Sequence, residues 1–480
     1  MGGFFRGAFE SKSTRWDVIA ILLLGGFALI TWLPALSTPF WGDDYGFLWA
    51  ARSAGLADQP WSETFWPVAP LPFWRPLSQE AWWRLVESVL RGDARLAHAV
   101  LLLLHAAAAF AVGMLALVVA RVAAWPARLQ VAGLSAGLYA VLALNLLPVH
   151  WVAAANSPLL VLLTALLLTV WLLASQLQGG WRLVMLAVVP LLFILALLSK
   201  ESAILMPALM LMFSLFAGRR FRLGDYLVLV ACVVLGATWL VLRQQVTVPP
   251  APQYTYAFGS NLVKNLVSLI AWMFNVPREA LRMVAAGELQ KGAVWAMATA
   301  LPVAIVWLLA LKTRRSRLTT LQWFVLLSFP VIAYAPYFPL VWNSYGYYAA
   351  IAGILPTIAL ARLLQGRGAV VVAVVLMGVS TWIAVAGTRM LDHPGLIGRA
   401  RWGETSLQQL SKAQLKAPLW VHVADEQRFY AMGLQGLAWR LGIPLEQVHQ
   451  VEACPVVGEQ QGTCLEMDAA GQWTHHPLAQ

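Results

Sequence analysis

Long apolar stretches separated by short polar segments dominate the pattern along the chain. Eleven stretches contain no Asp, Glu, Lys or Arg, and each has about the length that a helix needs to cross the ~30 Å hydrocarbon core of a membrane. They are Val18–Leu36, Leu96–Ala120, Leu129–Pro148, Pro158–Ala174, Leu183–Leu198, Ser202–Ala217, Tyr226–Leu242, Gly292–Leu311, Leu318–Leu340, Tyr345–Ala361 and Ala369–Thr388. This pattern predicts an all-α polytopic membrane protein with about eleven transmembrane helices.

Two apolar segments leave alternatives open, one outside these eleven stretches and one among them. The segment Asn261–Val276 contains Lys264, and we interpret it as an interfacial or re-entrant helix, because a further span would invert the topology after it. The first stretch could instead be a signal peptide cleaved near Ala35-Leu36-Ser37, although its 19 residues are long for that role.

The spans divide the chain into a membrane domain and a C-terminal tail outside the membrane. Residues 1–388 form the predicted membrane domain, whose large first outer loop covers residues 37–95. In that loop Gln79–Leu90 has the pattern of an amphipathic helix lying in the membrane interface. Residues 389–480 form a polar tail, in which Leu419–Ala424 is typical of a strand and Asp425–Leu441 of a helix ended by Gly442. The tail is therefore predicted to be a small α/β domain.

Composition and charge agree with a membrane protein and set its orientation. Hydrophobic residues make up 60% of the 480 residues and charged residues 11%, against about 25% charged in soluble domains. The net charge is +11, but with a cytoplasmic N-terminus the inner segments carry +12 and the longer outer segments −1. This is the positive-inside distribution, so we assign the charge to membrane orientation and exclude a nucleic-acid partner. Compact loops and the lack of an organellar targeting pattern indicate a bacterial inner membrane, with the tail in the periplasm.

The cysteines fit that orientation. Cys454 and Cys464 lie ten residues apart in the tail, with Pro455 and Gly458 between them for a turn. In an oxidising compartment they are expected to form a disulfide, the alternative being two free thiols. Cys232 lies inside a span and is interpreted as a small apolar residue.

The strongest candidate for chemistry is an acidic doublet directly after the first span. Asp43 and Asp44 lie among Trp41, Tyr45 and Phe47. Burial and a neighbouring negative charge both raise a carboxylate pKa, so either Asp could act as a general base. The pair could also bind a divalent cation such as Mg²⁺, Mn²⁺ or Zn²⁺. The plainer alternative is that one of them caps a helix over Tyr45–Ser53.

Three further outer positions carry candidate cations. Arg75 precedes the amphipathic segment, the Lys200-Glu201 doublet forms a short turn between two apolar runs, and Arg243 ends the seventh span. A guanidinium or ammonium at this level suits a lipid phosphate. The plainer explanations are that Arg75 snorkels to the membrane interface and that Lys200-Glu201 is a hairpin tip that sets the topology. Tyr345 belongs to an outer aromatic cluster that is either an interfacial belt or a platform for a sugar or polyprenyl chain.

Motifs of soluble cofactor enzymes are absent from the sequence. It contains no Walker A loop and no Gly-x-Gly-x-x-Gly between a strand and a helix, so no nucleotide cofactor is expected. The inner segments are too short for a nucleotide-sugar domain. A sugar donor would have to be presented on the outer side.

The order and side of these motifs resemble the GT-C superfamily of integral-membrane glycosyltransferases, near the protein O-mannosyltransferases and the aminoarabinose transferase of lipid A. The likeness rests on Asp43-Asp44 after the first span, Arg75-Pro76-Leu77 in the same loop, Lys200-Glu201 at an outer turn and, more weakly, Leu242-Arg243. It covers about residues 15–390, while the tail lacks the tetratricopeptide repeats of some relatives.

The resemblance implies transfer of a sugar from a polyprenyl-phosphate carrier to an acceptor on the periplasmic face. It makes Asp43 or Asp44 the catalytic base, with a divalent metal as an option. Arg75, Lys200, Glu201, Arg243 and Tyr345 become candidates for binding the donor and its phosphate. The acceptor, whether protein, lipid or envelope glycan, and the sugar are not specified by these residues.

Two other functions remain open at this level. One is an O-antigen ligase or polymerase type of enzyme that uses a diphosphate-linked glycan. The other is a lipid or oligosaccharide transporter, which the absence of ionisable residues within the spans argues against.

Overall fold

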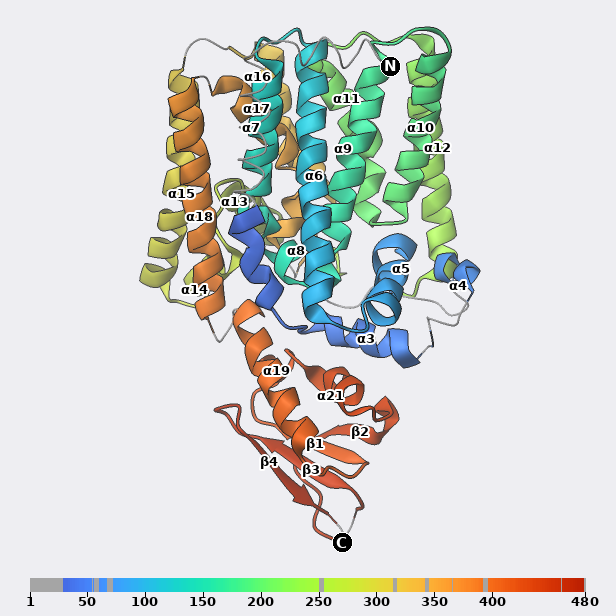
Figure 1. Ribbon diagram of the computed structural model, residues 1–480, viewed down its shortest axis with the longest axis vertical. Coiled ribbons are helices and arrows are strands. Elements are labelled where there is room, and N and C mark those ends of the chain that lie inside the picture. The colour runs from blue at the N-terminus through green and yellow to red at the C-terminus, as the bar shows by residue number, and fades with distance from the viewer. Residues whose placement is uncertain are drawn as a thin grey trace.

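The computed structural model describes residues 29–53, 55, 60–66, 72–249, 254–313, 317–341, 345–364, 366–391, 396–458 and 460–478. A bundle of long helices makes up most of the molecule, and a small domain of helices and strands lies at one end of it (Figure 1).

Six helices in the described part of the chain are long and apolar enough to cross a membrane. They are α6 (Ala94–Val122), η5 with α9 (Val152–Ala154 and Asn156–Ala174), α10 (Gly179–Leu197), α12 (Leu223–Val246), α15 (Leu289–Lys312) and α18 (Arg367–Met390). A seventh is formed if α7 (Arg128–Ala140) and the η4–α8 pair (Ala143–Asn145, Leu146–His150), bent by 48°, are counted as one span. The protein is therefore a mostly helical, multi-pass membrane protein.

The predicted count of eleven spans is not confirmed. Three predicted stretches form shorter apolar helices, namely η6–α11 (Glu201–Leu205, Met206–Ala217), α16 (Thr320–Ala333) and α17 (Ile354–Leu363). In the last two stretches the aromatic outer portions fold into short 3₁₀ turns, η8 (Ala335–Tyr337) and η9 (Gly346–Ala349), so apolar sequence there does not mean continuous helix. Most of the first predicted stretch, Val18–Leu36, lies outside the described residues.

A buried charge cluster joins the predicted cytoplasmic ends of the helices. The Asp225 carboxylate accepts hydrogen bonds from Arg182 Nη2 at 2.7 Å and Arg219 Nη2 at 2.8 Å. It also accepts from the backbone N–H of Arg222 at 2.8 Å, at the start of α12. One carboxylate thus connects the start of α10, the end of α11 and the start of α12. A buried acid surrounded by such donors is a structural element of the bundle.

Several short helices lie among and beside the spans, and α3 runs between the bundle and the C-terminal domain (Figure 1). They are η1 (Leu33–Ser37), α3 (Asp43–Ser53), α4 (Trp61–Phe65), the continuous η2–α5–η3 (Pro76–Glu80, Ala81–Arg84, Leu85–Val89), α13 (Ser260–Met273) and α14 (Arg278–Ala285).

The amphipathic segment Gln79–Leu90 is helical as predicted, but its apolar face packs against protein. Trp82 and Val86 are buried, and Trp82 Nε1 donates to the carbonyl of Val152 at 3.2 Å. Trp83 stacks on Phe47 of α3, with ring centroids 5.4 Å apart. The helix itself is confirmed, and its position in the membrane interface stays a prediction, because sequence periodicity shows that a face is apolar and not what covers it.

The C-terminal domain begins with α19 (Leu396–Lys412) and contains a four-stranded sheet in the order β2-β1-β3-β4. Strand β1 is parallel to β2 and β3, and β4 is antiparallel to β3. The remaining elements are β1 (Leu419–Val423), α20 (Glu426–Phe429), α21 (Gly433–Leu441), η10 (Leu445–Gln447), β2 (Val448–Val451), β3 (Thr463–Met467) and β4 (Trp473–Pro477). Cys454 and Cys464 form a disulfide, which connects the loop after β2 to β3.

The single helix predicted over Asp425–Leu441 is instead two helices. Asp425 caps the first, accepting from the backbone N–H of Arg428 at 3.0 Å, and Gly442 ends the second with a φ of +67°. Gly433, with a φ of +59°, begins the second helix after a turn at residues 430–432. This turn brings Tyr430 to the membrane domain.

Candidate active site

The two aspartates of the acidic doublet have different environments. Asp44 is completely buried, and its carboxylate accepts from the backbone N–H groups of Trp41 at 3.1 Å and Ala153 at 2.7 Å. Burial raises the Asp44 pKa well above its usual value, while these backbone hydrogen bonds oppose the rise. Asp44 therefore fastens the start of α3 to the η5 turn, and neither of these two donors belongs to α3 itself.

Asp43 is the first residue of α3, and its side chain is accessible from a cavity. Its Oδ1 accepts a hydrogen bond from the Tyr430 hydroxyl of the C-terminal domain at 2.6 Å. The surrounding protein raises the Asp43 pKa through desolvation, and the Tyr430 hydrogen bond lowers it. Of the two aspartates, Asp43 has the position and the accessibility that a general base needs.

The cavity next to Asp43 has a volume of about 590 Å³ and lies between the membrane helices and the C-terminal domain. This is within the range of small-molecule sites. Its lining is rich in arginines and aromatic rings: Asp43, Phe47, Phe73, Arg75, Ser78, Gln79, Trp151, Ala153, Asn156, Tyr254, Arg278, Arg282, Tyr345, Tyr347, Arg399, Glu426, Gln427 and Tyr430.

Arg75 reaches this cavity while paired with Glu201. Arg75 Nε and Nη2 donate to the Glu201 carboxylate at 2.7 to 3.0 Å, and the Arg75 guanidinium lies 4.2 Å from the centre of the Phe73 ring. Burial lowers the Arg75 pKa, but the Glu201 charge outweighs it and raises this pKa overall. Burial likewise raises the Glu201 pKa, and the Arg75 charge outweighs it and lowers that pKa overall. The Nη1 nitrogen is not part of this bidentate pair. Glu201 thus positions Arg75, and Arg75 can still present a donor to an anion.

Lys200 lies behind the cavity wall. Its ammonium donates to Asn156 Oδ1 at 2.9 Å and lies 4.8 Å from the centre of the Tyr347 ring. Burial, together with the nearby charge of Arg75, lowers the Lys200 pKa to about 7. Asn156 and Tyr347 line the cavity and Lys200 does not, so Lys200 acts on the cavity through these two residues.

Arg243 lies near the same group without lining the cavity. Its guanidinium is 6.0 Å from the centre of the Trp239 ring, and its charge helps to lower the Glu201 pKa. Trp239 in turn stacks on Trp74, next to Arg75, with ring centroids 6.1 Å apart. The structure therefore brings Arg75, Lys200, Glu201 and Arg243 together, as their common side in the sequence predicted, and places only Arg75 on the cavity.

Sequence reasoning missed a second group of cations on α14. Arg278 and Arg282 are four residues apart on this helix and both line the cavity. The Arg278 guanidinium lies 4.0 Å from the centre of the Tyr345 ring, which connects this group to a predicted site residue. The i, i+4 spacing of Arg278 and Arg282 after Pro277 indicates that both side chains lie on one face of a helix.

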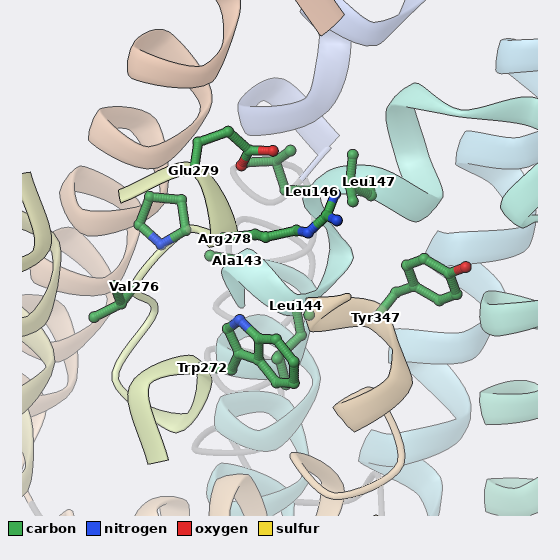
Figure 2. A pocket seen from close by; sticks show the side chains of 11 residues that line it. Ala143, Leu144, Leu146, Leu147, Trp272, Val276, Arg278, Glu279 and Tyr347 are labelled. Carbon is green, nitrogen blue, oxygen red and sulfur yellow. The ribbon is translucent and has the colours of Figure 1, made fainter. Parts of the chain in front are cut away.

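Arg278 also borders a much smaller cavity of about 30 Å³ between α14, the η4–α8 turn and η9 (Figure 2). Figure 2 shows Arg278 extending toward Leu147. Glu279 is buried, and burial raises its pKa, which the charge of Arg278 opposes. The aromatic and apolar walls of this small cavity support the Arg278 side chain where it enters the larger one.

The residues around the acidic doublet do not fit a divalent metal site. Both Asp44 oxygens accept backbone hydrogen bonds, and Asp43 receives a hydroxyl donor from Tyr430. The described residues contain no group of three or more His, Cys, Asp or Glu side chains arranged to hold a metal ion. Hard cations such as Mg²⁺ need several oxygen ligands, so we derive no step that depends on a metal.

Comparison with solved structures finds the same fold. The chain is similar to ArnT from Cupriavidus metallidurans, whose crystal structure is bound to undecaprenyl phosphate, with a TM-score of 0.53 and 13% identity over 95% of this chain and 94% of that chain. A similarity to the cryo-EM structure of the arabinofuranosyltransferase AftD from Mycobacteria has a TM-score of 0.43 and 15% identity, covering 86% of this chain and 29% of that chain. No protein-family model and no curated protein sequence matches the chain. The first similarity shows that the two chains share a fold along almost their whole length.

Proposed function

We propose that this protein is a membrane glycosyltransferase that moves a sugar from a polyprenyl-phosphate donor to an acceptor hydroxyl, with Asp43 as the general base. The observation that carries the proposal is the cavity itself. It places an accessible carboxylate with a raised pKa and the guanidiniums of Arg75 and Arg278 around one space of about 590 Å³. The fold is shared with ArnT, whose crystal structure holds a polyprenyl phosphate.

The chemistry requires a base and positive charge in one place. Asp43 would take the proton from the acceptor hydroxyl as the acceptor oxygen forms its bond to the anomeric carbon. The bond between that carbon and the phosphate oxygen breaks, and its electron pair leaves with the polyprenyl phosphate. Arg75, with Lys200 and Arg243 behind it, would stabilise the departing phosphate, and Arg278 offers a guanidinium from α14. The aromatic rings of Tyr345, Tyr347 and Trp151 suit the face of a sugar or an isoprenoid chain.

The reaction would take place on the periplasmic side of a bacterial inner membrane. The positive charge of the segments at the other end of the bundle argues for that orientation. The Cys454–Cys464 disulfide, in the domain that closes the cavity, fits an oxidising compartment. A lipid-linked donor would reach the cavity from the membrane, since Arg75 and Tyr345 lie next to the ends of the spans.

The test is donor cleavage by purified full-length protein in lipid, with a panel of polyprenyl-phosphate sugars and release of polyprenyl phosphate as the readout. Asp43→Asn should lower the rate by roughly 10²- to 10⁴-fold and leave the melting temperature unchanged. Glu446→Gln, at an exposed acid of the C-terminal domain that does not line the cavity, serves as the control and should retain activity.

Asp44→Asn should behave differently from Asp43→Asn. It replaces an acceptor of two backbone N–H groups by an amide, so we expect a lower melting temperature together with lower activity.

A fully active Asp43→Asn protein would remove Asp43 from the mechanism. Release only from diphosphate-linked glycans would favour the ligase or polymerase class instead.

A further inference from the structure

The C-terminal domain docks on α3, the helix that carries Asp43. Arg52 Nη1 donates to the carbonyl of Trp439 at 2.9 Å, and its guanidinium lies 4.9 Å from the centre of the Trp439 ring. The Tyr45 hydroxyl donates to Glu404 at 3.4 Å. Phe40, Tyr45, Leu48, Leu437 and Trp439 belong to one buried apolar cluster shared by the two domains. This packing fixes the position of α21 and of the turn before it.

That turn contacts the acidic doublet directly. The backbone N–H of Gly42 donates to the carbonyl of Ala431 at 2.8 Å. The adjacent Tyr430 donates its hydroxyl proton to Asp43 Oδ1 at 2.6 Å. Burial and the charge of Asp43 both raise the Tyr430 pKa, so this hydroxyl keeps its proton and remains a donor. Glu426, Gln427 and Arg399 of the same domain line the cavity beside it.

A carboxylate has two oxygens, and a general base needs only one of them for the acceptor proton. Building on the proposed function, we propose that Tyr430 is a positioning residue for transfer: the C-terminal domain holds Asp43 Oδ1 through the Tyr430 hydroxyl and so directs Oδ2 to the acceptor hydroxyl. The C-terminal domain is then part of the active site rather than an appendage. The acceptor, approaching the base, lies against the wall formed by Tyr430, Gln427 and Glu426.

Several charged groups surround Asp43 and bear on its protonation. Asp44 lies next to it on α3, and the cavity adds Arg75 of the first loop, Arg278 and Arg282 of α14, Arg399 of α19, Glu426 of α20 and the hydroxyls of Tyr254, Tyr345 and Tyr430. The hydrogen bond from Tyr430 favours the charged carboxylate, whereas burial disfavours it. Activity requires the carboxylate and falls as the pH drops through the Asp43 pKa. Removing the Tyr430 hydroxyl raises that pKa, so the acid limb should move to higher pH.

The experiment measures Asp43 protonation without relying on turnover. Full-length protein in lipid is treated with a water-soluble carbodiimide and an amine between pH 5 and 8, and modification of Asp43 is quantified by peptide mass spectrometry. Tyr430→Phe should raise the midpoint pH of Asp43 modification by about one unit. Tyr45→Phe, which removes the other interdomain tyrosine hydrogen bond, should leave it unchanged. In the transfer assay the acid limb of kcat should move by the same amount, with the donor KM unchanged.

An unchanged midpoint in Tyr430→Phe would overturn the proposal. So would a downward shift, because a domain that merely detaches takes away the burial that raises the Asp43 pKa. If the upward shift is found and no donor is cleaved by the wild-type protein, Tyr430 controls Asp43 as described and the glycosyltransferase assignment is what fails.

Discussion

Neighbouring residues of the same type have taken different roles at the acidic doublet. Asp44 is buried and satisfied by backbone N–H groups, while Asp43 faces a cavity and receives a side-chain donor from another domain. Successive residues at the start of a helix point about 100° apart, so one can be directed into the fold and the next out of it. The residue type sets the chemistry that the pair could perform, and the geometry of the helix start leaves only Asp43 facing the cavity.

The Arg75–Glu201 pair lends itself to a test of coupling between two site residues. Arg75→Met or Glu201→Gln alone leaves a charge at a largely buried position, and each should lower the free energy of unfolding by about 3 kcal/mol. The double variant should lose less than the sum of the two, because no charge remains unpaired. Chemical denaturation of the four proteins in one detergent, read as a double-mutant cycle, measures this coupling. Additive losses would mean that the two side chains do not depend on each other.

The same two single variants should differ in their effect on the donor KM. Glu201→Gln keeps the guanidinium, so the donor KM should rise only about threefold, whereas Arg75→Met should raise it at least tenfold. Equal effects of the two would indicate that Arg75 acts only as the partner of Glu201.

At the scale of elements, α3 connects the membrane domain to the C-terminal domain. Its start is fixed by Asp44 and its outer face packs on α21. Gly42 precedes it with a φ of +59°, and a Cβ added there would lie 3.1 Å from Tyr430 Cε1. The glycine is required both by the backbone conformation and by the close approach of Tyr430.

Substitution of Gly42 should therefore affect stability and activity together. Gly42→Ala forces an alanine into the left-handed region, at a cost of about 1–2 kcal/mol, and pushes on the Tyr430 ring. Gly46→Ala is the matched control, since it lies within α3 with nothing within 4 Å of an added Cβ and should be neutral or stabilising. Melting temperatures and donor cleavage for both variants check this. Equal behaviour of the two variants would show that the approach of Tyr430 to Gly42 is unimportant.

At the scale of the whole molecule, the candidate active site is formed between two domains. Asp43 and Arg75 come from the first loop of the membrane domain, Arg278 and Arg282 from α14, and Tyr430 with Arg399 from the C-terminal domain. The cavity borders the C-terminal domain, which lies at one end of the bundle (Figure 1), so the side of the membrane that this domain occupies is also the side of the proposed reaction.

Thiol labelling in intact cells tests that side. Ser411→Cys, exposed at the end of α19, should react with a membrane-impermeant maleimide in cells with a permeabilised outer membrane. Gln176→Cys, exposed between α9 and α10 at the other end, should react only after the inner membrane is disrupted. The native cysteines give little background, since Cys232 is buried and the other two form the disulfide. The reverse pattern would contradict the periplasmic assignment.

Much of the fold could be predicted from the sequence, and the site only in part. Helices α6, α9, α10, α12, α15 and α18 coincide with predicted spans because uninterrupted apolar runs leave the backbone little choice but helix in lipid. The runs that end in Pro and Tyr clusters form shorter helices next to 3₁₀ turns, and hydropathy does not reveal where such a run stops being a continuous helix. Arg75, Lys200, Glu201 and Arg243 were grouped correctly by their side of the membrane. The pairing of Arg75 with Glu201, which are 126 residues apart, could not be predicted.

The amino-acid sequence by itself determined the class of protein, its orientation preference and the residue types at its outer edge. These follow from hydropathy, charge and local spacing, which act over a few residues at a time. Only the tertiary structure decided which aspartate faces the cavity, which cations line it and that Tyr430, 387 residues from Asp43, completes it. Contacts of that separation arise from the packing of whole helices and domains, and no local pattern in the chain records them.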